Sequence, residues 1–181
     1  AETAIDISTR RLLDALDERE MPDITLAVLE RITRDGAASA ELQREVPFRR
    51  SAALVAISRQ EADGDKRAVL LDEAQAALDQ FLASAAPEDR QAIAAYTQKG
   101  TLLVERGRTK AEQATRPGAD AGRLRGEALG FFDDGIAALK GTVKPGEPIS
   151  KVTNAEDAVI KVLREVNARI DAIKAASTPD E

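Results

Sequence analysis

The chain has 181 residues and a formal net charge of −6, and its hydrophobic share of 43% includes only 3% aromatic residues. It contains neither cysteine nor histidine, which excludes disulfide bonds, cysteine nucleophiles, serine–histidine–aspartate triads and the usual zinc sites. A core of alanine, leucine, isoleucine and valine favours closely packed helices over a β-sandwich or a disordered chain. The negative charge argues against nucleic acid as a partner.

Two helices joined by a short break are predicted first. Ser8 or Thr9 is the candidate cap of the first helix. Pro22 suits the first turn of the second helix, and Gly36 ends it. The apolar positions at helical spacing are Leu12, Leu13, Leu16, Ile24, Val28, Leu29 and Ile32.

The next two helices are predicted over about 39–62 and 66–84. Pro47 lies inside the first of them and should split or kink it. Gly64 is a natural C-cap and Asp65 a natural N-cap, so the chain should turn within EADGD. A calcium loop is the alternative at this sequence, although the spaced ligand pattern is incomplete. The apolar positions of the second helix are Val69, Leu70, Ala74, Leu78, Phe81 and Leu82.

A fifth helix is predicted to run without a break over 88–114, although it contains Gly100 and Gly107. Each glycine costs about 1 kcal/mol relative to alanine inside a helix. The residues after Gly107 are strong helix formers, so the chain should not turn there. We expect the cost to be offset by close packing against the helices that carry Leu78 and Phe132.

After a loop at 116–122, a sixth helix is predicted over about 123–139. The sequence KGTVKPGEPIS at 140–150 is the best linker candidate, because it is rich in proline and glycine. A last helix begins at Thr153, which forms a capping box with Glu156. Its apolar positions form a heptad seam at Val159, Leu163, Val166, Ile170 and Ile173. Packing on a neighbouring helix is the favoured interpretation of this seam, and self-association is the alternative.

The fifth and sixth helices carry the spacing of a tetratricopeptide-type helix pair. The first-helix positions are Tyr96, Gly100, Leu103 and Gly107, and the second-helix positions are Ala128, Phe132 and Gly135. The sequence therefore predicts an all-α fold of about seven helices, in which antiparallel pairs stack as an irregular, right-handed, tetratricopeptide-like solenoid. This domain should cover 1–140, followed by a linker at 141–152 and a C-terminal helix at 153–181 that packs on the stack.

Three segments resemble the opening segments of long tetratricopeptide-like proteins of planctomycete-type bacteria: LLDALDEREMPDITLAVLERI, LLDEAQAALDQFLA and GTLLVERGRTKAEQA. The resemblance covers roughly 8–140. Glu20-Met21 stands where that family usually carries a Gly-Tyr pair, which removes an aromatic side chain from the first turn between helices. Family members are generally uncharacterised and longer, so the resemblance implies a helical-repeat fold and no catalytic residues. The chain is then expected to be a short member or an N-terminal piece.

The adjacent pair Asp133-Asp134 is the candidate for acid–base chemistry, but neighbouring side chains on a helix point about 100° apart. We therefore expect no enzyme, no cofactor and no metal. The basic stretch Arg106, Arg108 and Lys110 is a candidate docking patch for an acidic partner, with a solvated helix face as the alternative.

The function expected from these features is a non-enzymatic scaffold that binds a protein or peptide. The alternative is a self-assembling structural component of the cell envelope. No apolar run is long enough to cross a membrane. The alanine start resembles a mature end after removal of a secretory signal, so we expect a periplasmic or envelope location, with the cytoplasm as the alternative.

Overall fold

The structure of the protein is a computed structural model that describes residues 3–36, 38–85, 90–140 and 154–177. Within these residues the fold is all-α, with seven helices and no strand, as predicted. The chain divides into two compact units, Ala1–Asp89 and Arg90–Glu181. This division falls inside the predicted 1–140 domain. The predicted linker at 141–152 lies outside the described residues, which resume at residue 154 in the last helix.

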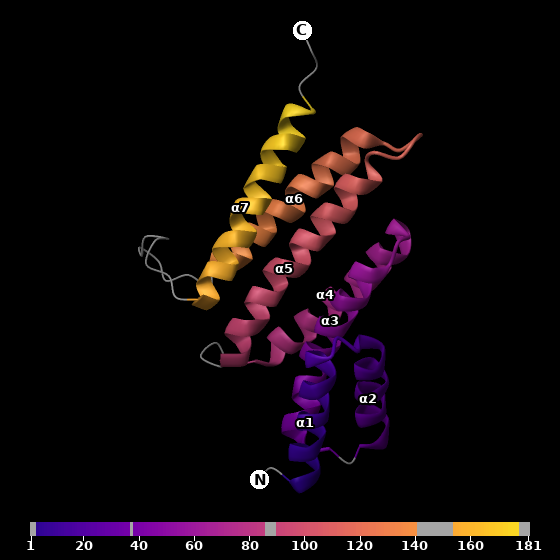
Figure 1. The fold of residues 1–181 in the computed structure, drawn as a ribbon, viewed down its shortest axis with the longest axis vertical. Helices are drawn as coiled ribbons and strands as arrows, with labels where there is room; N and C mark the ends of the chain where they lie inside the picture. The colour runs from indigo at the N-terminus through magenta and orange to yellow at the C-terminus, as the bar shows by residue number, and fades with distance from the viewer. Residues whose placement is uncertain (1–2, 37, 86–89, 141–153, 178–181) are drawn as a thin grey trace. The chain divides into compact units, whose positions relative to one another are not determined.

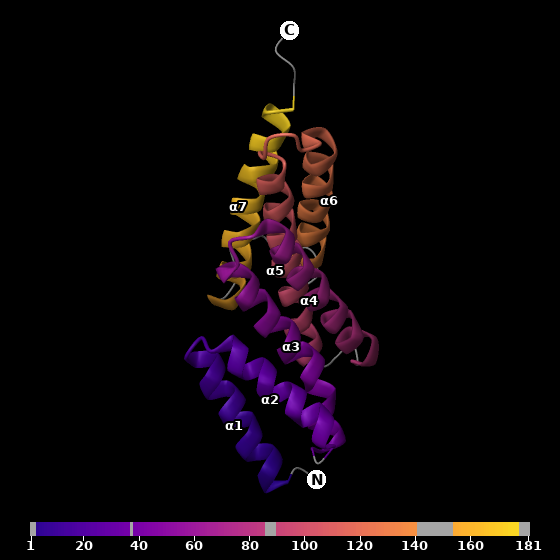
Figure 2. The same ribbon diagram turned by 90° about the vertical axis from the view of Figure 1, so that its right-hand side faces the viewer.

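The first unit contains four helices that pack in chain order (Figures 1 and 2). They are α1 (Ala4–Glu18), α2 (Pro22–Asp35), α3 (Ala40–Gln60) and α4 (Gly64–Ser84). The side chains of Leu13, Leu29 and Val46 join the first three helices in one buried cluster. Stacking of these pairs as a right-handed solenoid remains a prediction, because the structure establishes only the packing of neighbouring helices.

The first helix begins earlier than the sequence indicated. Thr3 is its cap, and it forms a capping box with Asp6, so the predicted caps Ser8 and Thr9 are wrong. The Ser8 hydroxyl instead donates to the carbonyl of Ala4 at 2.9 Å. The capping box satisfies free N–H groups of the first turn, which makes the earlier start favourable.

At the turn before α4 the predicted caps are also displaced. Asp63 is the N-cap and accepts the N–H groups of Asp65 and Lys66 at 2.8 and 3.3 Å, whereas Gly64 is already helical. Elsewhere the signals hold: Pro22 opens α2, and Gly36 ends it with a left-handed φ of 61°.

Of the two predicted effects of Pro47, the split is wrong, because α3 runs continuously from Ala40 to Gln60, and the kink stays a prediction. Proline removes one helical hydrogen bond. The helix is nevertheless buried on both sides of Pro47, at Leu42 and Val46 before it and at Leu54 after it. Tertiary packing of these side chains therefore stabilises the helix across the proline.

The predicted apolar faces are only partly buried. Leu12, Ile24 and Val69 were expected to point inward, but they are exposed. In α4, Ala74, Leu78 and Phe81 are buried as predicted, and the rings of Phe81 and Phe48 lie 5.3 Å apart. Two of these three exposed residues, Leu12 and Ile24, lie on the α1–α2 hairpin.

The second unit contains α5 (Arg90–Gln113), α6 (Ala121–Lys140) and α7 (Asn154–Ala175). Figures 1 and 2 both show the three helices side by side. Val166 and Ile170 of α7 join Val104, Ala128 and Phe132 in a buried cluster, so α7 packs on both α5 and α6. The predicted cap at Thr153 lies outside the described residues, as do the side chains of Val159 and Leu163.

The two glycines of α5 lie at close contacts with side chains of α6. The helix is continuous through Gly107, as predicted. A Cβ atom at Gly100 would lie 2.3 Å from Cγ of Leu139, and one at Gly107 would lie 2.6 Å from the ring of Phe132. The glycines were expected to pack against the helices that carry Leu78 and Phe132. The nearest atoms all belong to α6, so only the expected contact with the helix of Phe132 is confirmed.

Tyr96 requires a correction. It was expected to pack within the helix pair, but its side chain is 47% exposed. The small residues Ala92 and Gly100, one turn before and after Tyr96, are buried, and so is the adjacent Ala95. Small residues bring α5 close to its neighbour, and the larger ring lies outside that contact.

Candidate functional site

The predicted basic patch on α5 takes part in contacts within the second unit. The guanidinium carbon of Arg106 lies 4.3 Å from the centroid of the Phe131 ring, a cation–π contact. Arg108 donates to the carboxylate of Glu105 at 3.1 Å and also to Glu165 of α7. Arg108 therefore links α5 to α7 as well as carrying positive charge.

Lys110 completes the patch and is paired in the same way. Its Nζ lies 2.9 Å from Glu127 of α6, and this hydrogen bond, helped by the charges of Lys110 and Arg123, lowers the pKa of Glu127. The three predicted patch residues thus lie beside carboxylates or an aromatic ring of their own unit. An acidic partner would have to compete with these contacts, and binding at Arg106, Arg108 and Lys110 stays a prediction.

Exposed apolar side chains gather instead on the α1–α2 hairpin. The exposed large hydrophobic residues of the described chain are Ile5, Ile7, Leu12, Met21, Ile24, Val69 and Tyr96. The first five belong to α1, α2 or the turn between them. Single exposed apolar side chains are ordinary on a protein surface, so the ones that share a hollow are the more informative.

Two of these five side chains, Ile5 and Leu12, border a groove between α1 and α2, which we call the hairpin groove. Ile5 and Leu12 line it from α1, Val28 and Ile32 line it from α2, and Leu42 at the start of α3 closes its base. Its volume is about 340 Å³. Each row follows helical spacing, because Ile5 and Leu12 are two turns apart and Val28 and Ile32 are one turn apart.

The rim of the hairpin groove carries charges of both signs. Arg31 and Asp35 of α2 lie one turn apart and form an exposed ion pair at 3.2 Å. Such a pair contributes little to stability when both groups are in water. Both groups are therefore available to contact charged side chains of a bound segment.

A row of polar side chains on α1, the polar seam, holds this helix to α3. Its members Asp6, Arg10, Asp14 and Asp17 recur at about one helical turn. Asp6 accepts the N–H of Ser39 at 3.1 Å, at the N-cap of α3. The backbone N–H of Thr3, then that of Ser39, hold the pKa of Asp6 down to about 2.

The other three members of the polar seam, Arg10, Asp14 and Asp17, form ion pairs with α3. Arg10 donates to the buried carboxylate of Glu45 through two nitrogens, at 2.7 and 3.1 Å. Arg49 donates to Asp14 at 2.8 Å and to Asp17 at 3.3 Å. Burial nevertheless raises the pKa of Asp17. The polar seam therefore fixes α1, and with it one wall of the hairpin groove.

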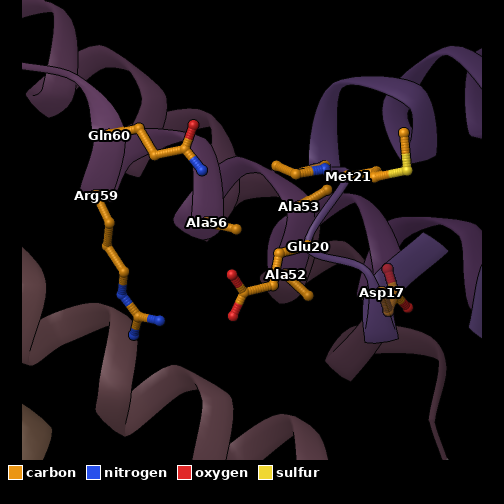
Figure 3. Close-up of a pocket in the computed structure, with 9 residues that line it drawn as sticks. Asp17, Glu20, Met21, Ala52, Ala53, Ala56, Arg59 and Gln60 are labelled. Atoms are coloured by element: carbon orange, nitrogen blue, oxygen red, sulfur yellow. The ribbon is translucent and has the colours of Figure 1, made fainter.

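A second hollow, of about 460 Å³, lies beside the α1–α2 turn (Figure 3). It exists because α3 has 21 residues and α2 only 14, so that α3 extends past the turn. Ala52, Ala53 and Ala56 of α3 form its floor, and the side chains of Glu20 and Arg59 extend into the same space. The lining offers opposite charges over small apolar residues, without a nucleophile and base arranged for catalysis.

Sequence reasoning missed both the hairpin groove and the polar seam. The signal for the groove was the capping box of Thr3 and Asp6, which would have started the first helix early enough to include Ile5. The signal for the seam was the recurrence of Asp6, Arg10 and Asp14 at intervals of four.

Among the described residues, no group of three or more acidic side chains is arranged to hold a metal ion. None of the helices in this described part is long and apolar enough to cross a membrane. Comparisons of the chain with protein-family models, with curated proteins and with solved structures gave no match.

Proposed function

We propose that the protein is a non-enzymatic helical scaffold that binds an amphipathic helix of another protein in the hairpin groove. The observation that carries this proposal is the pair of apolar rows, Ile5 with Leu12 and Val28 with Ile32, facing one hollow over the base formed by Leu42. Helices dock in such grooves through apolar residues at positions i, i+3, i+4 and i+7.

The rim indicates the chemistry of the bound helix. Arg31 and Asp35 carry opposite charges one turn apart, so a helix with Glu and Lys one turn apart beside its apolar stripe would complement them. The resemblance of residues 8–140 to tetratricopeptide-like proteins supports the same interpretation, since stacked helix pairs commonly bind peptides. Asp133 and Asp134 are both exposed on α6, which supports a surface role for them rather than acid–base catalysis.

The test uses a synthetic helical peptide of about four turns, built from Leu, Ala, Glu and Lys, with Leu along one face. Fluorescence anisotropy of the labelled peptide should show saturable binding in the micromolar range. Leu12→Glu should weaken binding at least about tenfold, because it places a charge in the apolar groove. A scrambled peptide of equal composition should not bind.

The matched control is Val69→Glu, which makes the same kind of change at an exposed apolar residue of α4. Circular dichroism should show that both variants remain helical. Binding that survives Leu12→Glu, or that Val69→Glu weakens equally, would contradict the proposal.

A further inference from the structure

The hollow beside the α1–α2 turn, which we call the turn hollow, is separate from the hairpin groove (Figure 3). The two share no lining residue. The volume of the turn hollow, about 460 Å³, lies within the range of about 300–1,000 Å³ that is typical of small-molecule sites. Its charged side chains therefore indicate what kind of small molecule it would hold.

Glu20, in the turn itself, combines a strained backbone with a carboxylate that the fold does not use. Its φ of 53° lies in the left-handed region, where a residue with a side chain is less stable than glycine. Its carboxylate extends into the turn hollow and forms no hydrogen bond or ion pair with any described residue. A charge held at a strained position without a partner in the fold points to a ligand.

The surroundings of Glu20 favour a bound cation. Glu20 follows the C-terminal end of α1, and the last turn of this helix contains no basic residue. The partial negative charge of the helix end adds to that of the carboxylate. Asp17 also lines the hollow, but it already accepts from Arg49 and from the hydroxyl of Thr25, each at 3.3 Å. Glu20 is therefore the carboxylate left for a positively charged group.

The end of α3 offers donors to an anion. Arg59 and Gln60 line the turn hollow, and Figure 3 shows the Arg59 guanidinium extending into the same space as the Glu20 carboxylate. Arg59 takes part in another interaction as well, but a guanidinium carries several N–H donors and can bind a carboxylate in addition. The hollow thus offers complementary partners to a ligand with charges of both signs.

The floor of the turn hollow sets the size of this ligand. Ala52, Ala53 and Ala56 form a floor without large side chains. From Ala52 to Gln60 the α3 helix rises about 12 Å, and three extended residues span about 10 Å. A short extended peptide therefore fits along α3, with small side chains against the alanines.

We propose that the turn hollow binds a short peptide with free termini and small side chains, whose ammonium group pairs with Glu20 and whose carboxylate pairs with Arg59. The site goes beyond the proposed function and does not depend on it, because the amphipathic helix contacts the hairpin groove instead.

Trialanine is the probe, tested by NMR titration of the isotopically labelled protein. It should shift the backbone amide signals of residues 17–22 and 52–60, with a Kd of about 1 mM or tighter. Its N-acetyl and C-amide forms each lack one charge and should bind at least about tenfold more weakly, because hydrogen bonds between charged groups are the strong ones. Shifts that do not saturate by about 20 mM would overturn the proposal, and so would capped forms that bind as tightly as trialanine.

Variants assign each end of the peptide. Glu20→Gln should weaken trialanine binding at least about tenfold but should not affect the N-acetyl form, which has no ammonium group. Arg59→Gln should weaken trialanine binding but should not affect the C-amide form. The matched control is Glu18→Gln, which removes an exposed carboxylate that does not line the hollow. A loss of affinity as large with Glu18→Gln as with Glu20→Gln would mean general charge attraction and would refute the site.

Glu20→Gly separates binding from a structural role of Glu20. Glycine adopts this φ without strain, so the urea midpoint should rise while trialanine binding falls at least about tenfold. A lower midpoint would show that Glu20 serves the fold and would contradict the proposal. Leu12→Glu, which should weaken binding of the amphipathic helix, should leave trialanine binding unchanged, so the proposed function and this site can fail independently.

Discussion

The α5–α6 and α1–α2 hairpins differ in how closely their two helices approach. In α5–α6, Gly100 and Gly107 face Leu139 and Phe132, and both of these large side chains are almost completely buried. The α1 and α2 helices contain no glycine, and the large side chains Ile5, Leu12 and Ile24 remain exposed. The glycines of α5 thus let large side chains of α6 pack directly against the α5 backbone.

This difference has a functional consequence. The apolar surface of the α5–α6 pair is covered by α7, through Val166 and Ile170. In the hairpin groove Ile5 and Leu12 stay exposed, whereas Val28 and Ile32 are partly buried against the core. The α1 helix is held both by Leu13 in that core and by the polar seam. The second unit therefore buries most of its large apolar side chains within its own core, whereas the first unit leaves several of them exposed on α1 and α2.

The largest loss of stability is expected when the α5 glycines are replaced by larger residues. Gly107→Leu should lower the free energy of unfolding by about 3 kcal/mol, at the upper end of overpacking effects, because the buried Phe132 ring cannot move aside. Gly100→Leu should behave similarly against Leu139. Urea denaturation gives the magnitude, and hydrogen exchange should show the loss in α5 and α6 rather than in α2 and α3.

Gly126 provides the matched control on α6. It is exposed, and a Cβ atom there would meet nothing within 4 Å. Gly126→Ala should therefore stabilise the protein by about 1 kcal/mol through helix propensity alone. If Gly107→Leu also stabilised the protein, the account of close approach between α5 and α6 would be wrong.

The α5 helix shows which features of the fold could be predicted from the sequence and which could not. Continuity of α5 and the tight site at Gly107 followed from local signals: helix formers after the glycine and tetratricopeptide-like spacing. The same spacing placed Tyr96 incorrectly, because spacing alone does not say which side of a helix meets a neighbour. Local patterns specify helices well but specify their buried faces only in part.

The candidate site was less predictable than the fold. Leu12 and Leu13 are equivalent in sequence, yet Leu13 is buried and Leu12 lines the hairpin groove. The distinction depends on where α2 and α3 lie. The ion pairs of the basic patch were unpredictable for a similar reason, because Glu127 and Glu165, the partners of Lys110 and Arg108, come from other helices. Long-range pairing of this kind leaves no local signal in one sequence.

A smaller effect is expected from breaking the polar seam that holds α1. Glu45→Ala should cost about 2 kcal/mol, because it leaves the Arg10 guanidinium without its buried partner. Replacing both Arg10 and Glu45 by methionine should recover much of this loss, since a well-packed apolar pair often substitutes for a buried ion pair. Urea denaturation of the single and double variants tests this, and equal losses in both would show that the pair itself is not the cause.

The smallest expected effect is the loss of the stabilising contribution of Asp6, which occurs only when the pH is lowered. Its hydrogen bonds from the backbone N–H groups of Thr3 and Ser39 hold its pKa to about 2, below the ordinary 3.8. Because the folded-state pKa is depressed, this stabilising contribution is complete above the ordinary pKa and is lost as the pH falls through about 2. Thr3 and Ser39 carry no titratable side chains, so the change is assigned to Asp6 itself.

The stability difference between the native chain and Asp6→Asn, measured by urea denaturation, should be constant above pH 4 and shrink toward pH 2. Amide exchange in the first turns of α1 should rise over the same interval. A difference that does not change with pH would mean that Asp6 holds α1 through its shape and not through its charge.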